Sequence, residues 1–398
     1  MKTGELEAAD QTAYAVEFRG GKTQLHGDGL PVFTIAVADE AQWQWFLKAD
    51  VYSAAMAFVR GDFDVRGDLV AAIRFFKQAA SRKNLKHWLF AVLERFAPHR
   101  LESWFQPKSR AARNIRFHYD RSNDFYCQFL DSRMQYSSAY FQDPAWSLEQ
   151  AQLAKLDLIC SKLALQPGER FLDVGCGWGG LLMHAAESYG VEAVGCTLSR
   201  RQFEYATAAA AHNGLMNRVL IRERDYRDLE GTFQKIASIG MFEHVGRRRL
   251  REYFRKIRDL LEEDGLFLNA GMTRPQFVKN NPETLFSRRK VFPGGELVHL
   301  ADVVREAENC GFDVLNVEDL RSHYALTARE WVRRLQQNRE ACLRLVDAET
   351  YRVWLLYLSN SILNFEWGLT GMYDVLMAKR RGYAPTISRN RAAVSMPR

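Results

Sequence analysis

The ten residues FLDVGCGWGG, at 171–180, have the types and spacing best suited to holding a ligand. An apolar run ends at Asp173 and enters a turn in which Gly175, Gly177 and Gly180 fit the pattern G-x-G-x-x-G. Glycines at this spacing let the backbone between a strand and a helix approach a bound cofactor closely. By itself the pattern suits either a nicotinamide dinucleotide or a cofactor without phosphates.

Residues about twenty positions further on separate these two kinds of cofactor. A nicotinamide site requires an acid there for the ribose, or a basic residue for a 2′-phosphate. The sequence AVGCTLSRRQ instead supplies Thr197, Leu198, Ser199 and Gln202, with no acid. Because Asp173 also suits a cationic, phosphate-free cofactor better than a pyrophosphate, the pattern favours S-adenosylmethionine.

The elements that must position this turn form an alternating pattern from about residue 147. Helical stretches separate most of the short apolar runs ERFLDVG, VEAVGCTL, RVLIRERD, KIASIGMFEH and GLFLNAG. Such runs are typical of parallel strands that are buried on both faces by helices. The sequence therefore predicts a doubly wound α/β sheet, with the ligand beyond the carboxyl ends of its strands. From Ala328 onward we expect mainly helices.

The first hundred residues predict a separate small α+β unit. Residues 13–18 and 31–39 alternate as strands do, a helix is expected over 40–59, and an amphipathic helix follows from Leu69. Another segment with an apolar face covers 87–96. The aromatic residues concentrated in these helices indicate either an ordinary core or a cavity that accommodates lipid.

A linker is expected between these regions, because residues 98–114 contain two prolines, mixed charges and little periodicity. The chain of 398 residues is also longer than one ordinary core. We therefore predict two domains, 1–105 and 106–398.

The net charge of +7 favours an anionic partner. Since no nucleic-acid-binding motif accompanies the charge, an anionic membrane surface is preferred over nucleic acid, and a solvated basic surface is the alternative. The six scattered cysteines include no C-x-x-C pair, which argues against a disulfide framework or a zinc site. No secretory signal or membrane-spanning run is visible. We expect a cytoplasmic protein, peripheral to the inner face of the membrane.

Six stretches, taken together, closely resemble the cyclopropane-fatty-acid synthase family, which includes the mycolic acid methyltransferases. They occur in the order HYDRSNDFY, MQYSSAYF, FLDVGCGWGG, TLSRRQ, RDYRDL and SIGMFEHVG. The resemblance covers residues 115–380, and residues 1–105 more loosely resemble the family's lipid-associated N-terminal domain. It implies a class I methyltransferase (Rossmann-like) fold with helical embellishments and, as in some family members, a homodimer.

The resemblance also implies which residues bind S-adenosylmethionine, with Asp225 and Tyr226 beside the adenine. The full set is Tyr136, Ser137, Asp173, Gly175, Cys176, Gly177, Gly179, Thr197, Leu198, Ser199, Gln202, Asp225 and Tyr226.

The family methylates a cis double bond within an acyl chain, usually on a membrane phospholipid. The resulting carbocation loses a proton from the new methyl group to a bicarbonate, which closes a cyclopropane ring. By resemblance, Glu243 and Tyr324 belong to the bicarbonate cage, whereas Ser138 and Ala270 replace a cysteine and a histidine. His118 is expected to order a lid over the acyl pocket or, as the lesser alternative, to move a proton.

These two replacements leave the product open. A retained bicarbonate gives a ring, whereas its loss gives a methyl-branched or methylated unsaturated chain. Two other classes remain: a methyltransferase of a soluble small molecule, and a non-catalytic binder of lipid or cofactor.

Overall fold

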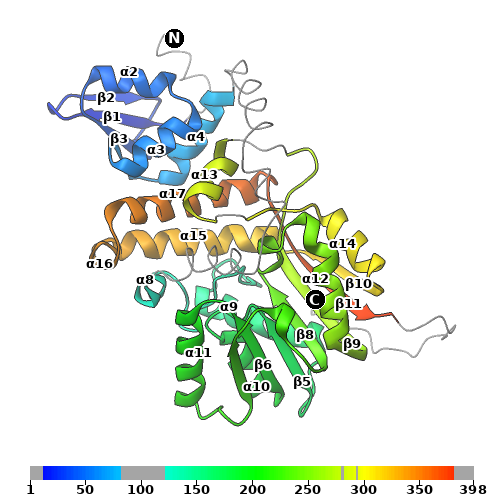
Figure 1. Ribbon diagram of the computed structural model, residues 1–398. Helices are drawn as coiled ribbons and strands as arrows, with labels where there is room; N and C mark the ends of the chain where they lie inside the picture. The colour runs from blue at the N-terminus through cyan, green and yellow to red at the C-terminus, as the bar shows by residue number, and fades with distance from the viewer. Residues whose placement is uncertain (1–11, 82–121, 279–281, 293–294, 381–398) are drawn as a thin grey trace. The chain divides into compact units, whose positions relative to one another are not determined.

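A computed structural model describes residues 12–81, 122–278, 282–292 and 295–380 (Figure 1). The chain forms two compact units. The first takes its residues from 1–106, 277–294 and 328–367, and the second from 107–276, 295–327 and 368–398. The division therefore differs from the predicted contiguous domains, because two segments from the second half of the chain pack with the N-terminal residues.

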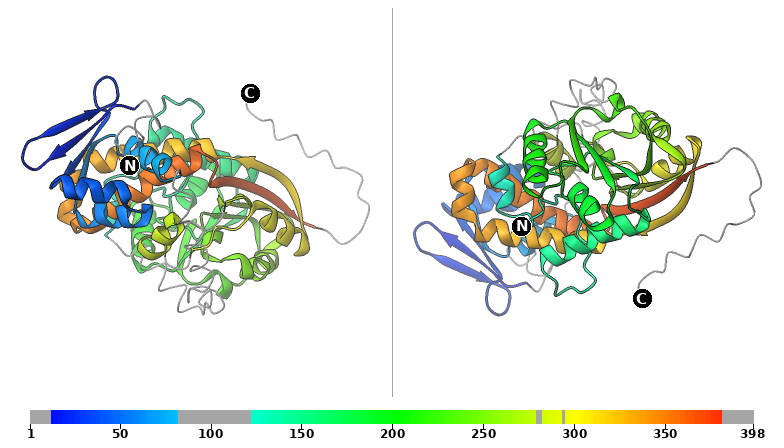
Figure 2. Two further views of the ribbon diagram at one scale, coloured as in Figure 1. Left: turned by 90° about the horizontal axis from the view of Figure 1, so that it is seen from above. Right: turned by 90° about the horizontal axis from the view of Figure 1, so that it is seen from below.

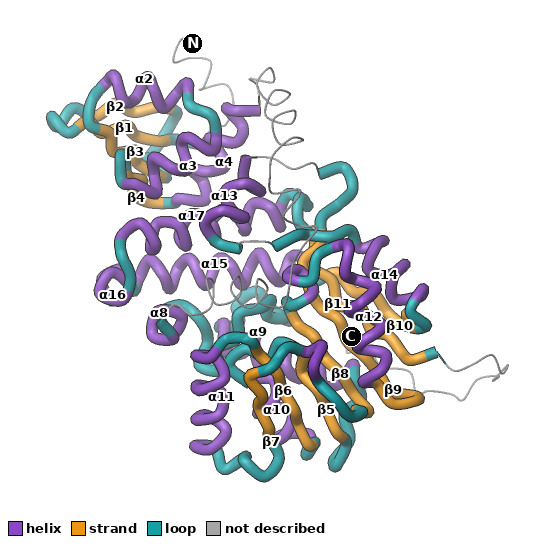
Figure 3. Tube along the Cα trace, viewed as in Figure 1, coloured by secondary structure: helices purple, strands orange, loops and turns teal. Residues whose placement is uncertain are grey.

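The second unit contains a seven-stranded sheet in the order β10-β11-β9-β8-β5-β6-β7 (Figure 3). Its strands are β5 (Arg170–Val174), β6 (Glu192–Thr197), β7 (Val219–Glu223), β8 (Phe233–Ile239), β9 (Leu261–Thr273), β10 (Phe312–Asp319) and β11 (Gly371–Lys379). Strands β5 to β9 pair in parallel, whereas β11 runs antiparallel to both β9 and β10. This arrangement confirms the predicted doubly wound fold.

The strand β11 was not predicted, because the last seventy residues read as mainly helical. It pairs with β9 from Gly371↔Thr273 to Ala378↔Leu266 and so lies inside the sheet rather than at its edge. The sequence GMYDVLMAK carries apolar residues on both faces, a pattern that a buried strand and a buried helix share.

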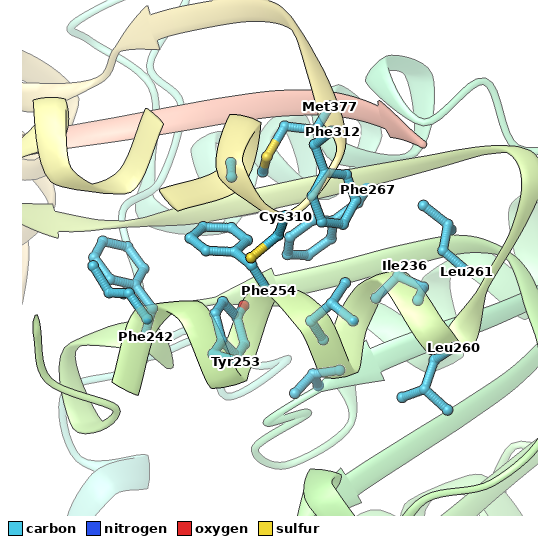
Figure 4. Packing of buried hydrophobic residues seen from close by; sticks show 14 of the residues in the cluster. Ile236, Phe242, Tyr253, Phe254, Leu260, Leu261, Phe267, Cys310, Phe312 and Met377 are labelled. Carbon is cyan, nitrogen blue, oxygen red and sulfur yellow. The ribbon is translucent and has the colours of Figure 1, made fainter. Parts of the chain in front are cut away.

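Helices of the second unit are α8 (Asn123–Cys127), α9 (Leu148–Lys162), α10 (Gly180–Tyr189), α11 (Arg200–His212), α12 (Leu250–Leu260) and α14 (Leu300–Asn309). Helix α12 buries a stripe at helical spacing that includes Tyr253 and Phe254. Figure 4 shows this stripe against Phe267 of β9 and Phe312 of β10, whose ring centroids are 5.8 Å apart. This packing fixes one layer of helices against the sheet that carries the glycine turn.

The first unit contains a small sheet, the dark blue arrows of Figure 2, in the order β2-β1-β3-β4. Its strands are β1 (Tyr14–Phe18), β2 (Thr23–His26), β3 (Phe33–Val37) and β4 (Asp64–Gly67). Its helices are α2 (Glu40–Lys48), α3 (Val51–Arg60), α4 (Leu69–Ser81), α13 (Pro282–Lys290), α16 (Arg339–Leu345) and α17 (Ala348–Glu366). Helix α15 (Arg321–Gln337) begins in the second unit and ends in the first.

The helix predicted over 40–59 is two helices. Ala49 has an extended backbone, and the Asp50 carboxylate accepts a hydrogen bond from the Ser53 amide to cap α3. An Asp at the N-cap satisfies one of the free amides of a new helix, so it can begin a helix within an apolar pattern. The predicted apolar segment 87–96 and the linker at 98–114 lie outside the described residues.

Candidate functional site

The glycine turn follows β5 directly and is held by the neighbouring strand. The carbonyl of Cys196 accepts hydrogen bonds from both the Gly175 and Cys176 amides, at 3.0 Å each. Gly177 has φ +54°, and a side chain there would meet no atom of the described residues within 4 Å. Within the described part of the chain the backbone at Gly177 is therefore open, as an approach to a ligand requires.

Asp173, at the end of β5, carries a vacant acceptor beside this turn. It is buried, and its Oδ1 atom makes no hydrogen bond within the described residues. Burial raises the pKa of Asp173 to about 7, and the nearby charge of Lys155 lowers it only in part. A buried carboxylate oxygen without a donor suits a cationic or hydrogen-bond-donating ligand.

Lys155 of α9 is a functional candidate that sequence reasoning missed. Its buried amine donates to Gln135 Oε1 at 2.6 Å and to Ser137 Oγ at 3.0 Å. Burial lowers the pKa of Lys155 to about 8, against the charges of Asp131 and Asp173. The amine thus holds the loop that carries Tyr136 and Ser137, and its charge acts on the acid near the end of β5. Its only signal in the sequence was a lysine among the apolar positions of a helix.

The same loop is fixed by two further side chains. Asp131 Oδ1 accepts from the Gln135 amide at 2.7 Å, and Gln152 of α9 donates to the Ser137 carbonyl at 3.0 Å. Tyr136 is half-buried, with its ring centroid 5.8 Å from that of Tyr126. The loop therefore presents Tyr136 and the Ser137 hydroxyl from a fixed backbone.

Trp178 joins the glycine turn to α8. Its ring centroid lies 5.0 Å from that of Tyr126, and its indole Nε1 donates to Asn123 Oδ1 at 2.9 Å. Part of the motif HYDRSNDFY thus packs against the turn. His118, in the same motif, lies outside the described residues.

The predicted residues after β6 form the start of α11. Thr197 Oγ1 donates to Gln202 Oε1 at 2.8 Å, and Ser199 Oγ accepts from the Gln202 amide at 3.3 Å as the N-cap. Leu198, between them, is half-buried. These contacts place a polar helix start at the carboxyl end of β6, next to β5, the strand that carries Asp173.

The third predicted segment follows β7. The Asp225 carboxylate accepts two hydrogen bonds from Arg227. Nε donates to Oδ1 at 2.9 Å and Nη2 donates to Oδ2 at 2.6 Å, so each carboxylate oxygen already has one donor. Tyr226 packs edge-on against Tyr253, with ring centroids 5.6 Å apart. Sequence reasoning did not find Arg227, which holds the acid in place.

Cys176 is buried in the glycine turn. Burial raises the pKa of its thiol well above the usual value, so the group is a neutral, unreactive side chain. Gly179, with φ +84°, completes the turn as the N-cap of α10.

The residues after β5, β6 and β7 therefore meet at one edge of the sheet, as the switch-point rule requires. They combine the buried Asp173 carboxyl, whose Oδ1 atom has no donor among the described residues, with the accessible backbone of Gly177, hydroxyl groups and aromatic rings. These groups fit S-adenosylmethionine: Asp173 and Gly177 suit its cationic part, and Tyr226 suits its adenine.

Glu243 follows β8 in a short 3-10 turn (Phe242–His244) and is buried. Its Oε1 atom accepts from the Met272 amide at 2.7 Å, whereas Oε2 is buried without a hydrogen bond in the described part of the chain. Burial raises the pKa of Glu243 to about 7. His244 stays neutral, because burial lowers its pKa to about 4. Glu243 therefore has an acceptor that can take a proton near neutral pH.

Ser138 lies in a loop that is anchored to α15. Its hydroxyl donates to the Ala139 carbonyl at 3.0 Å, and the Ala139 amide donates to Thr327 Oγ1 at 2.9 Å. Tyr324 is half-buried on the same helix, one turn before Thr327. The structure thus ties the segments of Ser138 and Tyr324 together.

The side chain of Ala270 lies on the face of β9 that is turned away from the Glu243 carboxylate. A Cβ added at Gly271 would point at the Glu243 carboxylate, and adjacent strand residues point to opposite faces. Ala270 is paired with Asp374 of β11, whose carboxylate binds Lys162 at 2.7 Å. The position that resemblance gave to a histidine holds a buried methyl group on the far side of the strand.

Among the described residues, no helix combines the length and apolar character needed to cross a membrane. The basic cluster at 247–251 is partly neutralised, because Arg247 pairs with Asp302 at 2.9 Å and Arg251 with Glu306 at 2.9 Å. In α13, Arg289 is exposed. The cluster that includes Lys108 lies outside the described part of the chain.

Comparisons with known proteins agree with this geometry. The family model described as mycolic acid cyclopropane synthetase matches residues 106–375. The chain is 39% identical, over 81% of its length and 81% of the relative's, to a probable fatty acid methyltransferase from Pseudomonas putida. It is 35% identical to cyclopropane mycolic acid synthase 1 from Mycobacterium tuberculosis, over 64% of this chain and 93% of that protein.

A solved structure extends the similarity to three dimensions. The mycolic acid cyclopropane synthase CmaA1, solved in complex with SAH and CTAB, superposes with a TM-score of 0.65 at 33% identity, over 69% of this chain and 99% of that one. The fold and the cofactor predicted from the sequence are thereby confirmed. The chain belongs to the mycolic acid cyclopropane synthetase family and is an S-adenosylmethionine-dependent methyltransferase.

Proposed function

We propose that the protein transfers the methyl group of S-adenosylmethionine to the cis double bond of an unsaturated acyl chain on a membrane phospholipid. The buried Glu243 carboxyl carries this proposal, since its Oε2 atom has no hydrogen-bond partner in the described residues. An alkene is a weak nucleophile, and its methylation leaves a carbocation. Such a reaction needs an anion and a proton acceptor in a site that excludes water.

When bound, the cofactor supplies an electrophilic methyl group. Asp173 and Tyr136 would hold it in line with the double bond. The π electrons of that bond would form the new C–C bond to the methyl carbon while the methyl–sulfur bond breaks, so that S-adenosylhomocysteine leaves and a positive charge remains on the neighbouring acyl carbon. Glu243 then takes a proton at Oε2. Its pKa of about 7 allows a large fraction of the carboxylate to be ionised at neutral pH.

The position of that proton decides the product. Loss from the new methyl group closes a cyclopropane ring, and loss from a neighbouring chain carbon gives a methylated unsaturated chain. The second product is favoured by the Ser138 hydroxyl, which is engaged by the Ala139 carbonyl, and by Ala270, which has no polar side-chain atom. Both features weaken the expected bicarbonate cage.

We further propose that the substrate is presented on an anionic phospholipid surface. The net charge of +7 and the basic cluster Arg288–Lys290 of α13 support this partner. Sedimentation with phosphatidylglycerol vesicles should deplete the protein from solution at low salt and release it at high salt. Equal sedimentation with neutral phosphatidylcholine vesicles would contradict the proposal.

Labelled cofactor tests the reaction itself. The enzyme is incubated with trideuteromethyl S-adenosylmethionine and vesicles that carry cis-unsaturated chains, with saturated-chain vesicles as the control. Mass spectra of the released fatty acids then distinguish the products, because a ring keeps two deuterium atoms and a methylated alkene keeps all three. Absence of label in lipid excludes both products, and cofactor turnover without lipid would indicate a soluble substrate.

A further inference from the structure

The segment 295–299, which precedes α14, holds the turn that carries Glu243. The Glu296 amide donates to the Glu243 carbonyl at 3.1 Å. The Glu296 side chain acts on the far end of the same turn, because its Oε2 atom accepts from the Arg247 amide at 3.1 Å. One residue, distant in sequence, thus contacts the turn on both sides of Gly246.

The Glu296 carboxylate supplies a cap that the turn lacks. The 3-10 turn Arg247–Arg249, which leads into α12, begins after Gly246, and no side-chain hydrogen bond from Gly246 caps it. Free amides at the start of a helical segment need an acceptor, and the Glu296 carboxylate provides one for Arg247. A Cβ added at Gly246 would be 3.2 Å from Glu296 Oε2, so the acid lies closely against the turn.

The segment 295–299 is itself anchored to β9. Val298 forms a parallel bridge with Thr273 at the end of that strand, and both residues are buried. Met272 of the same strand donates its amide to Glu243 Oε1 at 2.7 Å. Strand β9 and the segment 295–299 therefore form one hydrogen-bonded support, which holds the Glu243 turn from the side chain and from the main chain.

The Glu243 carboxyl depends on such support. It is buried, and within the described residues its only hydrogen-bond donor is the Met272 amide, since Oε2 has no partner there. A buried acid with so few donors is costly to ionise, which favours any rearrangement of the turn that brings water to it. The two hydrogen bonds of Glu296 oppose that rearrangement.

We propose that Glu296 is a positioning residue for methyl transfer, which keeps the Glu243 carboxyl in place by fixing both ends of its turn. In this role Glu296 touches no reacting atom and acts through Glu243 alone. The inference rests on the proposed function, because it takes Glu243 as the proton acceptor. It adds to the site a residue that no sequence motif indicated.

Single-turnover rates with labelled cofactor and cis-unsaturated vesicles test this role. Glu296→Ala should lower the rate at least about tenfold, with cofactor affinity and the half-saturating lipid concentration unchanged. Glu296→Gln keeps an oxygen that can accept from the Arg247 amide, and it should stay within about threefold of the wild type. Glu306→Ala is the matched control, because this half-buried acid binds α12 through Arg251 at 2.9 Å and should leave the rate unchanged.

The pH profile at saturating cofactor separates positioning from a loss of folded protein. Ionised Glu243 accepts the proton, so the wild-type rate should rise with pH around a midpoint near its pKa of about 7. Water that reaches the loosened turn in Glu296→Ala should move this midpoint at least about half a unit lower. The neighbours do not titrate there, since burial lowers the pKa of His244 to about 4 and raises that of Tyr253 well above its usual value.

A stability measurement separates this inference from the reaction itself. The difference between the wild type and Glu243→Gln in the change of melting temperature from pH 5.5 to pH 8 reports the titration of Glu243. In the Glu296→Ala background that difference should shrink by at least about half, whether or not lipid is methylated. If it shrinks while no lipid is methylated, the proposed function fails and the support of Glu243 by Glu296 stands.

Three results would overturn the positioning role. They are a Glu243 contribution of undiminished size in the Glu296→Ala background, a wild-type rate in Glu296→Ala, and an unchanged pH midpoint in that variant. The first result decides the matter even for a protein that methylates no lipid. The other two would leave the proposed reaction intact and remove Glu296 from it.

Discussion

The carboxylate of Glu243 lies against the backbone of Gly271. A Cβ added at Gly271 would be 2.8 Å from Oε1 and 2.9 Å from Oε2, and 2.3 Å from a ring carbon of Phe242. Contacts this short cannot exist without a shift of the turn that carries Glu243. The absence of a side chain at Gly271 therefore allows the acid to reach the Met272 amide.

Gly271→Ala should inactivate methyl transfer and leave the cofactor site intact. The added methyl group displaces the Glu243 carboxylate, and a displacement of about 1 Å at a reacting group can cost on the order of 100-fold in rate. Single-turnover rates with labelled cofactor measure the loss, and calorimetric titration measures cofactor affinity. A variant with the wild-type rate would show that Glu243 does not act where the structure places it.

Cofactor affinity should depend on pH through Asp173. Its pKa of about 7 means that much of the folded protein carries a neutral Asp173 below neutral pH. A cationic ligand binds better to the ionised form, so affinity should rise by about tenfold between pH 6 and pH 8 and then level off. The charge of Lys155 acts on Asp173, and Lys155 stays largely charged over most of this range, since its pKa is about 8.

Asp173→Asn is the control for this titration. Binding to the variant should be weaker than to the wild type and should vary little over the same pH range. If the variant keeps the wild-type pH dependence, the titrating group is elsewhere.

Lys155→Met should weaken S-adenosylmethionine binding by at least about tenfold. The substitution removes the donor of the partly buried Ser137 Oγ and of the buried Gln135 Oε1, at a cost of about 1–3 kcal/mol for the buried acceptor. Lys162→Met on the same helix is the matched control, because that buried amine binds Asp374 and Glu318 instead. Both variants should melt at lower temperature, but only Lys155→Met should lose cofactor affinity. If the two variants bind S-adenosylmethionine with equal affinity, Lys155 has only a structural role.

The sequence was sufficient for the parts of the site that depend on local pattern. Apolar runs followed by Asp173 and by Thr197 identified strand ends, and parallel strands bring their ends together whatever the details of the fold. The break between α2 and α3 at Asp50, the N-cap of α3, was missed because the helical spacing of apolar residues continues across it. Local pattern therefore located the cofactor turn better than it located helix ends.

Long-range pairing was beyond the sequence pattern. Nothing in 371–379 indicates that β11 inserts beside β9, a strand about a hundred residues earlier, and nothing in 328–367 indicates that it packs with the N-terminal unit. Lys155 illustrates the same limit, because a lysine is expected at a surface unless its partners are known. Its partners Gln135 and Ser137 come from a loop whose fold is irregular.

Glu243 should also make stability depend on pH in a direction opposite to that of a salt-bridged acid. Its folded pKa of about 7 exceeds the ordinary value of 4.5, so between these values the folded state holds a proton that the unfolded state has lost. The contribution of Glu243 to the free energy of unfolding is therefore largest below pH 4.5. It falls as pH rises from 4.5 through 7, by up to about 3 kcal/mol in total. Glu243→Gln removes the titration and retains the shape, and Asp173 contributes equally to both proteins. Melting temperatures at pH 5.5 and pH 8 should therefore show the variant gaining on the wild type as pH rises, and a constant difference would mean that Glu243 is ionised throughout.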